Sequence, residues 1–234
     1  MTLTKPVAAP PLKHELRAVA TRLLLPFLVV GGLTVLMGLF LTRVLDNSGV
    51  ADADVATNRW LVDHRSGSGV ALSKYGTLLG ETPTIVGLTA IAAVVLRLVY
   101  KRWREPLLLV VCVSGQAIIF LITTLLIDRN RPRVSRLDDS PPTSSFPSGH
   151  AAATTAFYVG LALIVAWHTR ATWLRWLIVG IGVLFPLIMA FCRMYRGMHY
   201  PTDIAVSIAL GLTLLATALK LMPLGEGGGR GRPG

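Results

Sequence analysis

Long apolar stretches alternate with short polar segments along most of the chain. Six of these stretches approach the length of about 20 residues that an α-helix needs to cross the hydrocarbon core of a bilayer. They lie near Leu23–Leu45, Gly80–Val99, Pro106–Ile127, His150–Trp167, Trp176–Phe191 and Asp203–Leu221. Backbone polar groups in lipid need partners within their own segment, so the pattern predicts helices rather than strands. We therefore expect an all-α, polytopic membrane protein with six transmembrane helices.

The composition agrees with this prediction. Of the 234 residues, 53% are hydrophobic and only 15% are charged, and the mean hydropathy is +0.60. A typical soluble domain has about 25% charged residues. The length fits one domain. We expect an N-terminal tail over residues 1–22, a six-span membrane domain over residues 23–222 and a glycine-rich tail over residues 223–234.

The polar segment over residues 46–78 is the longest one between two spans. Within it, Ala53–Val62 mixes apolar and polar residues in the way of an amphipathic helix that lies in the membrane interface. We expect a turn at Ser66–Gly69, where serine and glycine alternate. The apolar run before this segment is too long for a secretory signal, which predicts an uncleaved first span.

The charges predict an orientation. With six spans, the side that holds both termini carries thirteen Lys/Arg and three acidic residues, and the opposite side carries ten and nine. The more positive side is expected to be cytoplasmic, which places both termini in the cytoplasm. Six of the arginines on the opposite, extracytoplasmic side lie close to the two sequence motifs described below, namely Arg129, Arg131, Arg133, Arg136, Arg193 and Arg196.

The net charge of +11 does not indicate nucleic acid as a partner, because no basic run is interleaved with aromatic residues. Cys112 and Cys192 fall at different membrane depths and are expected to be unpaired. His150, His199 and Asp203 form a set that metal sites also use, but the surrounding arginines would repel a cation. We therefore expect neither a metal nor another cofactor.

The first chemical motif is Pro147-Ser148-Gly149-His150, directly before the fourth span. A helix start presents free N–H groups and a partial positive charge, so it binds anions. Ser148 adds a hydroxyl group, and Gly149 lets a ligand approach the backbone closely. The alternative interpretation of such a segment is a turn that only caps the helix.

The second motif is Arg193, then His199 and Asp203, at the start of the sixth span. Asp203 follows His199 by four residues, which places both on one helical face. A carboxylate there can bind one ring nitrogen of the histidine and leave the other free as a nucleophile. Arg193 and Arg131 offer paired donors for phosphate oxygens. Taken alone, His199 and Asp203 could be a capping pair, but both motifs fall on the same predicted membrane face.

At these residues the chain resembles the type 2 phosphatidic acid phosphatase superfamily, which includes bacterial acid phosphatases and vanadium haloperoxidases. That family has three motifs, Lys-x6-Arg-Pro, Pro-Ser-Gly-His and Ser-Arg-x5-His-x3-Asp. The second is complete here, and the third has Cys192 in place of the serine. The first keeps Arg131-Pro132 but has Thr124 in place of the lysine. The resemblance covers roughly residues 75–220 and implies the helical core that these enzymes share.

The resemblance also implies a mechanism. His199 would attack phosphorus to give a phosphohistidine, and Asp203 would orient it. His150 would protonate the leaving oxygen and then activate water. Arg131, Arg193, Ser148 and the Gly149 backbone would hold the phosphoryl oxygens, without a metal. Thr124 is too short to replace the lysine, so we predict that Arg129 supplies this charge. Pro132 is expected to turn the chain, which makes Arg133 a weaker candidate.

Six spans favour a lipid substrate over a soluble one. We expect a lipid phosphatase of the plasma membrane that acts on phosphatidate, phosphatidylglycerol phosphate or a polyprenyl pyrophosphate. The additional arginines weakly favour a diphosphate. Two alternatives remain open, a lipid phosphotransferase and an inactive lipid-binding or transport protein with the same fold.

Overall fold

The computed structural model describes residues 10–139 and 143–224, and within these ranges it contains helices and no strand. Six helical segments are long and apolar enough to cross a membrane. Together with the structural likeness given below, they confirm the predicted all-α, multi-pass fold. The elements are α1 (Leu12–Leu39), η1 (Phe40–Val44), α2 (Gly49–Asp63), α3 (Gly67–Leu78), α4 (Thr82–Tyr100), α5 (Arg104–Leu126), α6 (Gly149–Thr154), η2 (Thr155–Val159), α7 (Gly160–His168), α8 (Thr172–Tyr195) and α9 (Pro201–Leu221).

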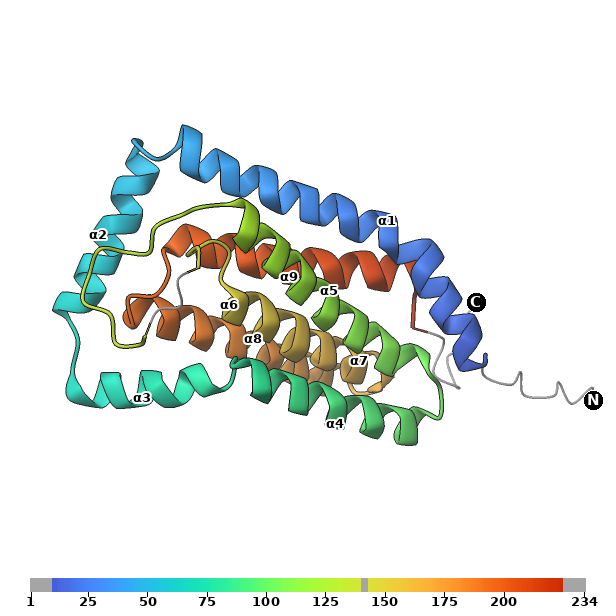
Figure 1. Ribbon diagram of the computed structural model, residues 1–234. Helices are drawn as coiled ribbons and strands as arrows, with labels where there is room; N and C mark the ends of the chain where they lie inside the picture. Colours follow the sequence, from blue (N-terminus) through green and yellow to red (C-terminus); the bar gives the residue numbers. More distant parts are fainter. Residues whose placement is uncertain (1–9, 140–142, 225–234) are drawn as a thin grey trace, which may run out of the picture.

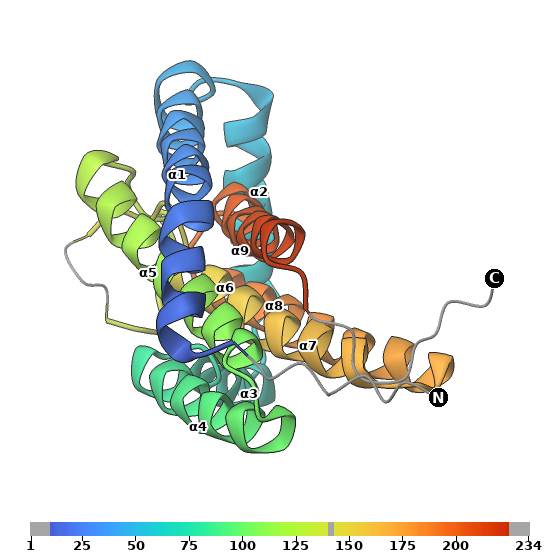
Figure 2. The ribbon, with the colours of Figure 1, turned by 90° about the vertical axis from the view of Figure 1, so that its right-hand side faces the viewer.

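The fourth span lies at the centre of the bundle. It is one continuous helix, α6–η2–α7. Of the residues in its apolar stretch 67% are buried, whereas 17% are buried in the corresponding stretches of the first span, which contains α1, and of α4. Figures 1 and 2 show α1, α4, α5, α8 and α9 arranged along and around it. The outer helices turn their apolar side chains outward, as a lipid-facing surface requires. The central helix begins with the Ser-Gly-His segment, so the bundle holds this segment from several sides.

Small residues let the helices approach the central span closely. Gly211 of α9 has no side chain at the point where α9 crosses the first turns of the central helix. A Cβ atom there would lie 2.7 Å from Thr155 Cβ and 3.2 Å from the carbonyl oxygen of Ala152. The position of α9 relative to α6 therefore depends on this glycine.

Two helices outside the six spans cover one end of the bundle. Helix α2 lies across this end, where it contacts α8 and α9 (Figure 1). A helix is therefore present at Ala53–Val62, as expected, and its buried residues include Asp54 and Asn58; its place in the membrane interface stays a prediction. The turn expected at Ser66–Gly69 is wrong, because Ser66 caps α3 by accepting a hydrogen bond from the backbone N–H of Gly69. This capping satisfies a free N–H group at the helix start.

The chain ends differ from the expectation in part. Helix α1 begins at Leu12, so residues 12–22 of the expected N-terminal tail are helical. Residues 1–9 and the glycine-rich segment 225–234 lie outside the described residues. Both cysteines are buried and unpaired, as expected.

The close contact at Gly211 leads to a test of stability. We expect Gly211→Ala to lower the melting temperature in detergent, because a methyl group forced into a packed contact costs about 1–3 kcal/mol. Gly87→Ala is the matched control, since a Cβ atom at Gly87 has no neighbour within 4 Å. Thermal unfolding of both purified variants would measure this. Equal melting temperatures would contradict the packing described here.

Candidate active site

Both sequence motifs meet in one pocket of about 440 Å³ at the end of the bundle that α2 covers. The start of α6, the residues before α9 and the last turn of α8 each contribute to its wall. Described residues of the segment between α5 and α6, among them Arg131, Asp138 and Ser144, complete the lining. Of the predicted site residues, the pocket is lined by Arg131, Gly149, His150, Arg193 and His199.

Two arginines supply the positive charge of the pocket. Arg131 is fixed by donating to the carbonyl oxygen of Met198 at 2.9 Å. Arg193 is buried and donates to a carboxylate oxygen of Asp138 at 3.2 Å. In each guanidinium the buried Nε has no hydrogen-bond partner among the described residues. These two N–H groups are available to an anion, and an arginine donor suits a phosphate oxygen.

The Ser-Gly-His segment forms the other wall. Ser148 is fully buried and caps α6 by accepting from the backbone N–H of Ala151. Ser148 is not among the residues that line the pocket, so its contact with phosphate stays a prediction. Gly149 lies against the ring of Phe120, where a Cβ atom would come within 3.0 Å. A side chain at this position would therefore have to displace the Phe120 ring. His150, one residue on, faces the pocket.

A turn at the end of α8 brings His199 back toward this wall. Gly197 has a φ of 73°, a left-handed conformation that favours glycine and ends the helix. His199 Nδ1 lies 2.7 Å from the carbonyl oxygen of Ser145. A carbonyl only accepts, so Nδ1 carries the hydrogen and Nε2 keeps its lone pair. Burial, and then the charges of Arg193 and Arg131, lower the pKa of His199 well below its ordinary value, so the ring is neutral.

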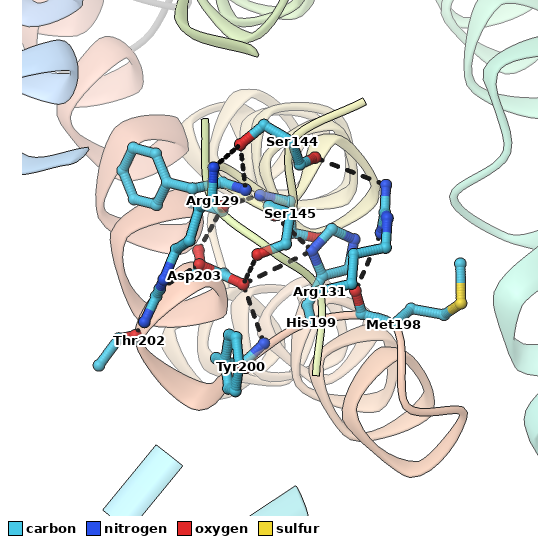
Figure 3. Close-up of polar contacts among 12 residues, drawn as sticks. Arg129, Arg131, Ser144, Ser145, Met198, His199, Tyr200, Thr202 and Asp203 are labelled. Carbon is cyan, nitrogen blue, oxygen red and sulfur yellow. Dashed lines mark hydrogen bonds and ion pairs between the residues drawn. The ribbon is translucent and has the colours of Figure 1, made fainter. Parts of the chain in front are cut away.

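Asp203 orients His199 through Ser145 rather than by a direct hydrogen bond. Its Oδ2 accepts from the Ser145 hydroxyl at 2.8 Å and from the Tyr200 backbone N–H at 2.9 Å. The distance from Asp203 Oδ2 to His199 Nδ1 is 3.9 Å. Figure 3 shows Ser145 between the two side chains. The sequence placed Asp203 beside the histidine correctly but assigned it the wrong hydrogen bond.

Arg129 binds the opposite side of Asp203. Its guanidinium forms ion pairs with Asp203 and, at 2.9 Å, with Asp54 of α2. It also donates to the Thr202 hydroxyl at 2.9 Å (Figure 3). Asp54 in turn accepts from the Thr202 backbone N–H at 3.0 Å, which holds the first turn of α9. We call this buried group of Asp54, Arg129, Thr202 and Asp203 the ion-pair network.

These contacts correct the prediction that Arg129 replaces the missing lysine. Arg129 does not line the pocket, because two buried carboxylates bind it from the other side. Thr124, near the end of α5, does not line the pocket either, and Pro132 is a buried residue next to Arg131. The additional arginines that were expected to favour a diphosphate do not line the pocket either. Arg196 binds Asp138 and Ser73, and Arg133 and Arg136 are exposed.

Sequence reasoning missed Asp54, Asp138 and Ser145. Asp138 accepts from both Arg193 and Arg196. Although burial opposes ionisation, the hydrogen bond and charge of Arg196, with the charge of Arg193, lower the pKa of Asp138. Ser145 precedes the Pro-Ser-Gly-His motif by two residues, so its closeness to the motif was the available signal. Asp54 gave none, since its partners are more than 70 residues away.

A second groove, of about 750 Å³, lies between α1 and α5. Its lining includes Phe27, Gly31, Gly115 and Ser114 and has no titratable side chain. The groove therefore lacks the charge that a phosphate needs. The chemistry belongs to the smaller pocket.

The family model of the PAP2 superfamily matches residues 85–224, which include both motifs. The chain belongs to the PAP2 superfamily. This confirms the resemblance noted in the sequence, and PAP2 membership makes the pocket a candidate phosphatase site.

The chain is also similar to individual proteins and to a solved structure. The chain is 35% identical to a decaprenylphosphoryl-5-phosphoribose phosphatase of Mycobacterium tuberculosis over 142 residues, 56% of this chain and 67% of that protein. It is 33% identical to the bacitracin transport permease protein BcrC of Bacillus licheniformis over 81 residues, 35% of each chain. The crystal structure of a transmembrane PAP2-type phosphatidylglycerolphosphate phosphatase from Bacillus subtilis has a TM-score of 0.73 at 22% identity, covering 81% of this chain and 94% of that one.

The ion-pair network predicts a large loss of stability for Arg129→Ala. The substitution leaves Asp54 and Asp203 buried without their arginine, and breaking a buried pair in this way costs about 3–5 kcal/mol. We expect a lower melting temperature in detergent, and no such change for the exposed control Arg133→Ala. An Arg129→Ala protein with normal stability but reduced kcat/KM would instead indicate direct contact with the substrate.

Proposed function

We propose that this PAP2 protein is an integral membrane phosphatase that hydrolyses a lipid phosphate monoester or diphosphate through a phosphohistidine intermediate. The observation that carries this proposal is the meeting of His150, His199, Arg131 and Arg193 in one pocket at one end of a membrane-spanning bundle. Family membership supports phosphatase activity in a multi-pass membrane protein.

In the first step, Nε2 of His199 attacks phosphorus. An N–P bond forms, the bond between phosphorus and the leaving oxygen breaks, and His150 donates a proton to that oxygen. The hydrogen bond to Ser145 supports this role, because it fixes the tautomer with a free lone pair on Nε2. The lowered pKa of His199 keeps that lone pair unprotonated near neutral pH.

In the second step, His150 takes a proton from water. The water oxygen bonds to phosphorus, the N–P bond breaks and phosphate leaves. A histidine side chain such as His150 suits this exchange of protons. The same group serves as acid and then as base, so no further titratable side chain is needed.

In this proposal the protein itself balances the charge of the transferred phosphoryl group. The free Nε–H groups of Arg131 and Arg193 and the backbone at Gly149 point to that role. A metal ion is not required for either step. Activity that persists in excess EDTA would agree with this, and activity that requires added divalent ions would overturn it.

The substrate is proposed to be a lipid held in the bilayer. The names of two similar proteins refer to a decaprenyl-linked phosphoribose and to phosphatidylglycerol phosphate. Part of the pocket wall is apolar, with Ile85 and Val86 of α4 and Val113 and Phe120 of α5. A lipid whose phosphate lies between the arginines would place its next atoms against this wall.

Replacing each histidine should have a distinct effect on turnover. We expect His199→Ala to abolish phosphate release, because no other side chain replaces the nucleophile. His150→Ala should slow release by about 10²–10⁴-fold, the usual contribution of general acid–base catalysis. The loss should be smaller for an aryl phosphate with a good leaving group than for a lipid phosphate. Equal losses on both would exclude His150 as the acid.

The distinction from a phosphotransferase or an inactive binding protein rests on the products. Phosphate release from detergent-purified protein on a panel of lipid mono- and diphosphates tests it. If the protein releases phosphate from none of the lipids in the panel, the phosphatase function is excluded. Transfer of the group to an added alcohol in preference to water would identify a phosphotransferase.

We further propose that the protein lies in the plasma membrane with the pocket on the extracytoplasmic face and both termini in the cytoplasm, on the basis of the charge distribution. Both natural cysteines are buried. An impermeant maleimide applied to intact cells should therefore label Ser135→Cys, in an exposed loop beside the pocket, and spare Ala171→Cys at the opposite end. The reverse labelling would invert the orientation.

A further inference from the structure

The pocket extends beyond the phosphate-binding arginines to polar side chains that the proposed mechanism does not use. Gln116 lies in the middle of α5 and is only 3% exposed, and Thr77 lies in the last turn of α3 and is 7% exposed. Both line the pocket. The Gln116 Oε1 and the Thr77 Oγ1 have no hydrogen-bond partner among the described residues.

Buried polar atoms without partners are unfavourable, and more so inside a membrane span. Gln116 is surrounded along α5 by apolar residues, and an apolar side chain of its size would fill the same space. Because this polar group also lines the pocket that holds the two arginines, a ligand in the pocket can supply the missing partner. The same argument applies to Thr77.

The chemistry of this part of the pocket indicates what the ligand is. Glu81, the residue before α4, also lines the pocket and forms no ion pair with the described residues. A carboxylate repels a second phosphate group, and the arginines that could offset it are bound elsewhere or exposed. A hydroxyl group is neutral and can donate to Glu81 or to the Gln116 oxygen. It can also accept from the Thr77 hydroxyl.

We propose that Thr77, Glu81 and Gln116 form a hydroxyl-binding subsite for a glycerol or sugar group that links the phosphate to the lipid. The subsite lies in the same pocket as the arginines, which would bind the phosphate. It also lies beside the apolar side chains of α4 and α5, which would contact the lipid chain. The protein thereby prefers phosphate esters of hydroxyl-bearing groups to phosphatidate and to polyprenyl diphosphates, which have no hydroxyl group beside the phosphate. This inference rests on the proposed phosphatase function.

The experiment compares kcat/KM for phosphate release on four lipids. Phosphatidylglycerol phosphate and a polyprenyl-linked sugar phosphate carry hydroxyl groups, whereas phosphatidate and a polyprenyl diphosphate do not. We expect Gln116→Leu and Thr77→Val each to lose about tenfold on the first two, the effect of one lost hydrogen bond to a buried partner. On the last two lipids they should match the wild type. If only the glycerol or only the sugar substrate responds, that substrate is the natural source of the hydroxyl group.

Thr123→Val is the matched control. Thr123 lies on α5 like Gln116, is fully buried and also has an Oγ1 without a partner, but it faces the other groove. Relative to the wild type, Thr123→Val should change kcat/KM by the same factor on the hydroxyl-bearing lipids as on the other two. A second test measures the wild type on a deoxy analogue, which is one of the hydroxyl-bearing lipids without the hydroxyl group beside its phosphate. The analogue should lose about tenfold, and Gln116→Leu should lose nothing further on it.

The outcomes separate the two proposals. If no lipid releases phosphate with the wild type, the proposed function fails. If the wild type releases phosphate but Gln116→Leu and Thr77→Val lower kcat/KM equally on all four lipids, the hydroxyl subsite is excluded. A wild type that accepts the deoxy analogue as well as the hydroxylated lipid would exclude it too.

Discussion

The arrangement of the pocket depends on how the buried charge of Asp203 is balanced. Asp203 is fully buried, and an isolated carboxylate at such a position would be strongly unfavourable. Arg129 offsets the charge from one side, and the Ser145 hydroxyl and the Tyr200 N–H complete its hydrogen bonds. Arg129 and Ser145 come from the two ends of the segment between α5 and α6, and Tyr200 directly precedes α9. The requirement to satisfy one carboxylate therefore fixes the end of α5, the loop before α6 and the start of α9 relative to one another.

Asp54 extends this constraint to the covering helix α2. It is the second carboxylate on Arg129 and caps the start of α9 through Thr202. Two acidic groups and one arginine form a compact network, so a segment outside the six spans helps to position the residues beneath it. On the other side of the pocket, Asp138 has a similar role, because it holds Arg193 and Arg196 together. The arginines that face the pocket are thus held in place before a phosphate arrives, which lowers the cost of ordering them.

The pocket combines three chemical environments within one bundle. Arginines and a helix start lie at the covered end, partnerless polar atoms lie along α3 and α5, and apolar side chains of α4 and α5 complete the wall. A lipid phosphate has the same components, a charged group, a linker and an apolar chain. The central position of the span that carries His150 helps to maintain this order, because neighbouring helices bury more of it than of any other span.

Six spans, the family motifs and their gathering at one end of the bundle could all be predicted from the amino-acid sequence. These follow from local properties, namely apolar stretches of membrane-spanning length, helix starts and fixed motif spacing. The partners of the charged side chains could be found only in the folded structure. Arg129 was expected at the phosphate but binds Asp54 and Asp203, and Asp203 reaches His199 through Ser145. Spacing along the chain cannot show such pairings, because a buried charge binds the groups that the fold brings next to it. Asp54, for example, lies 148 residues from its partner Thr202 in the sequence.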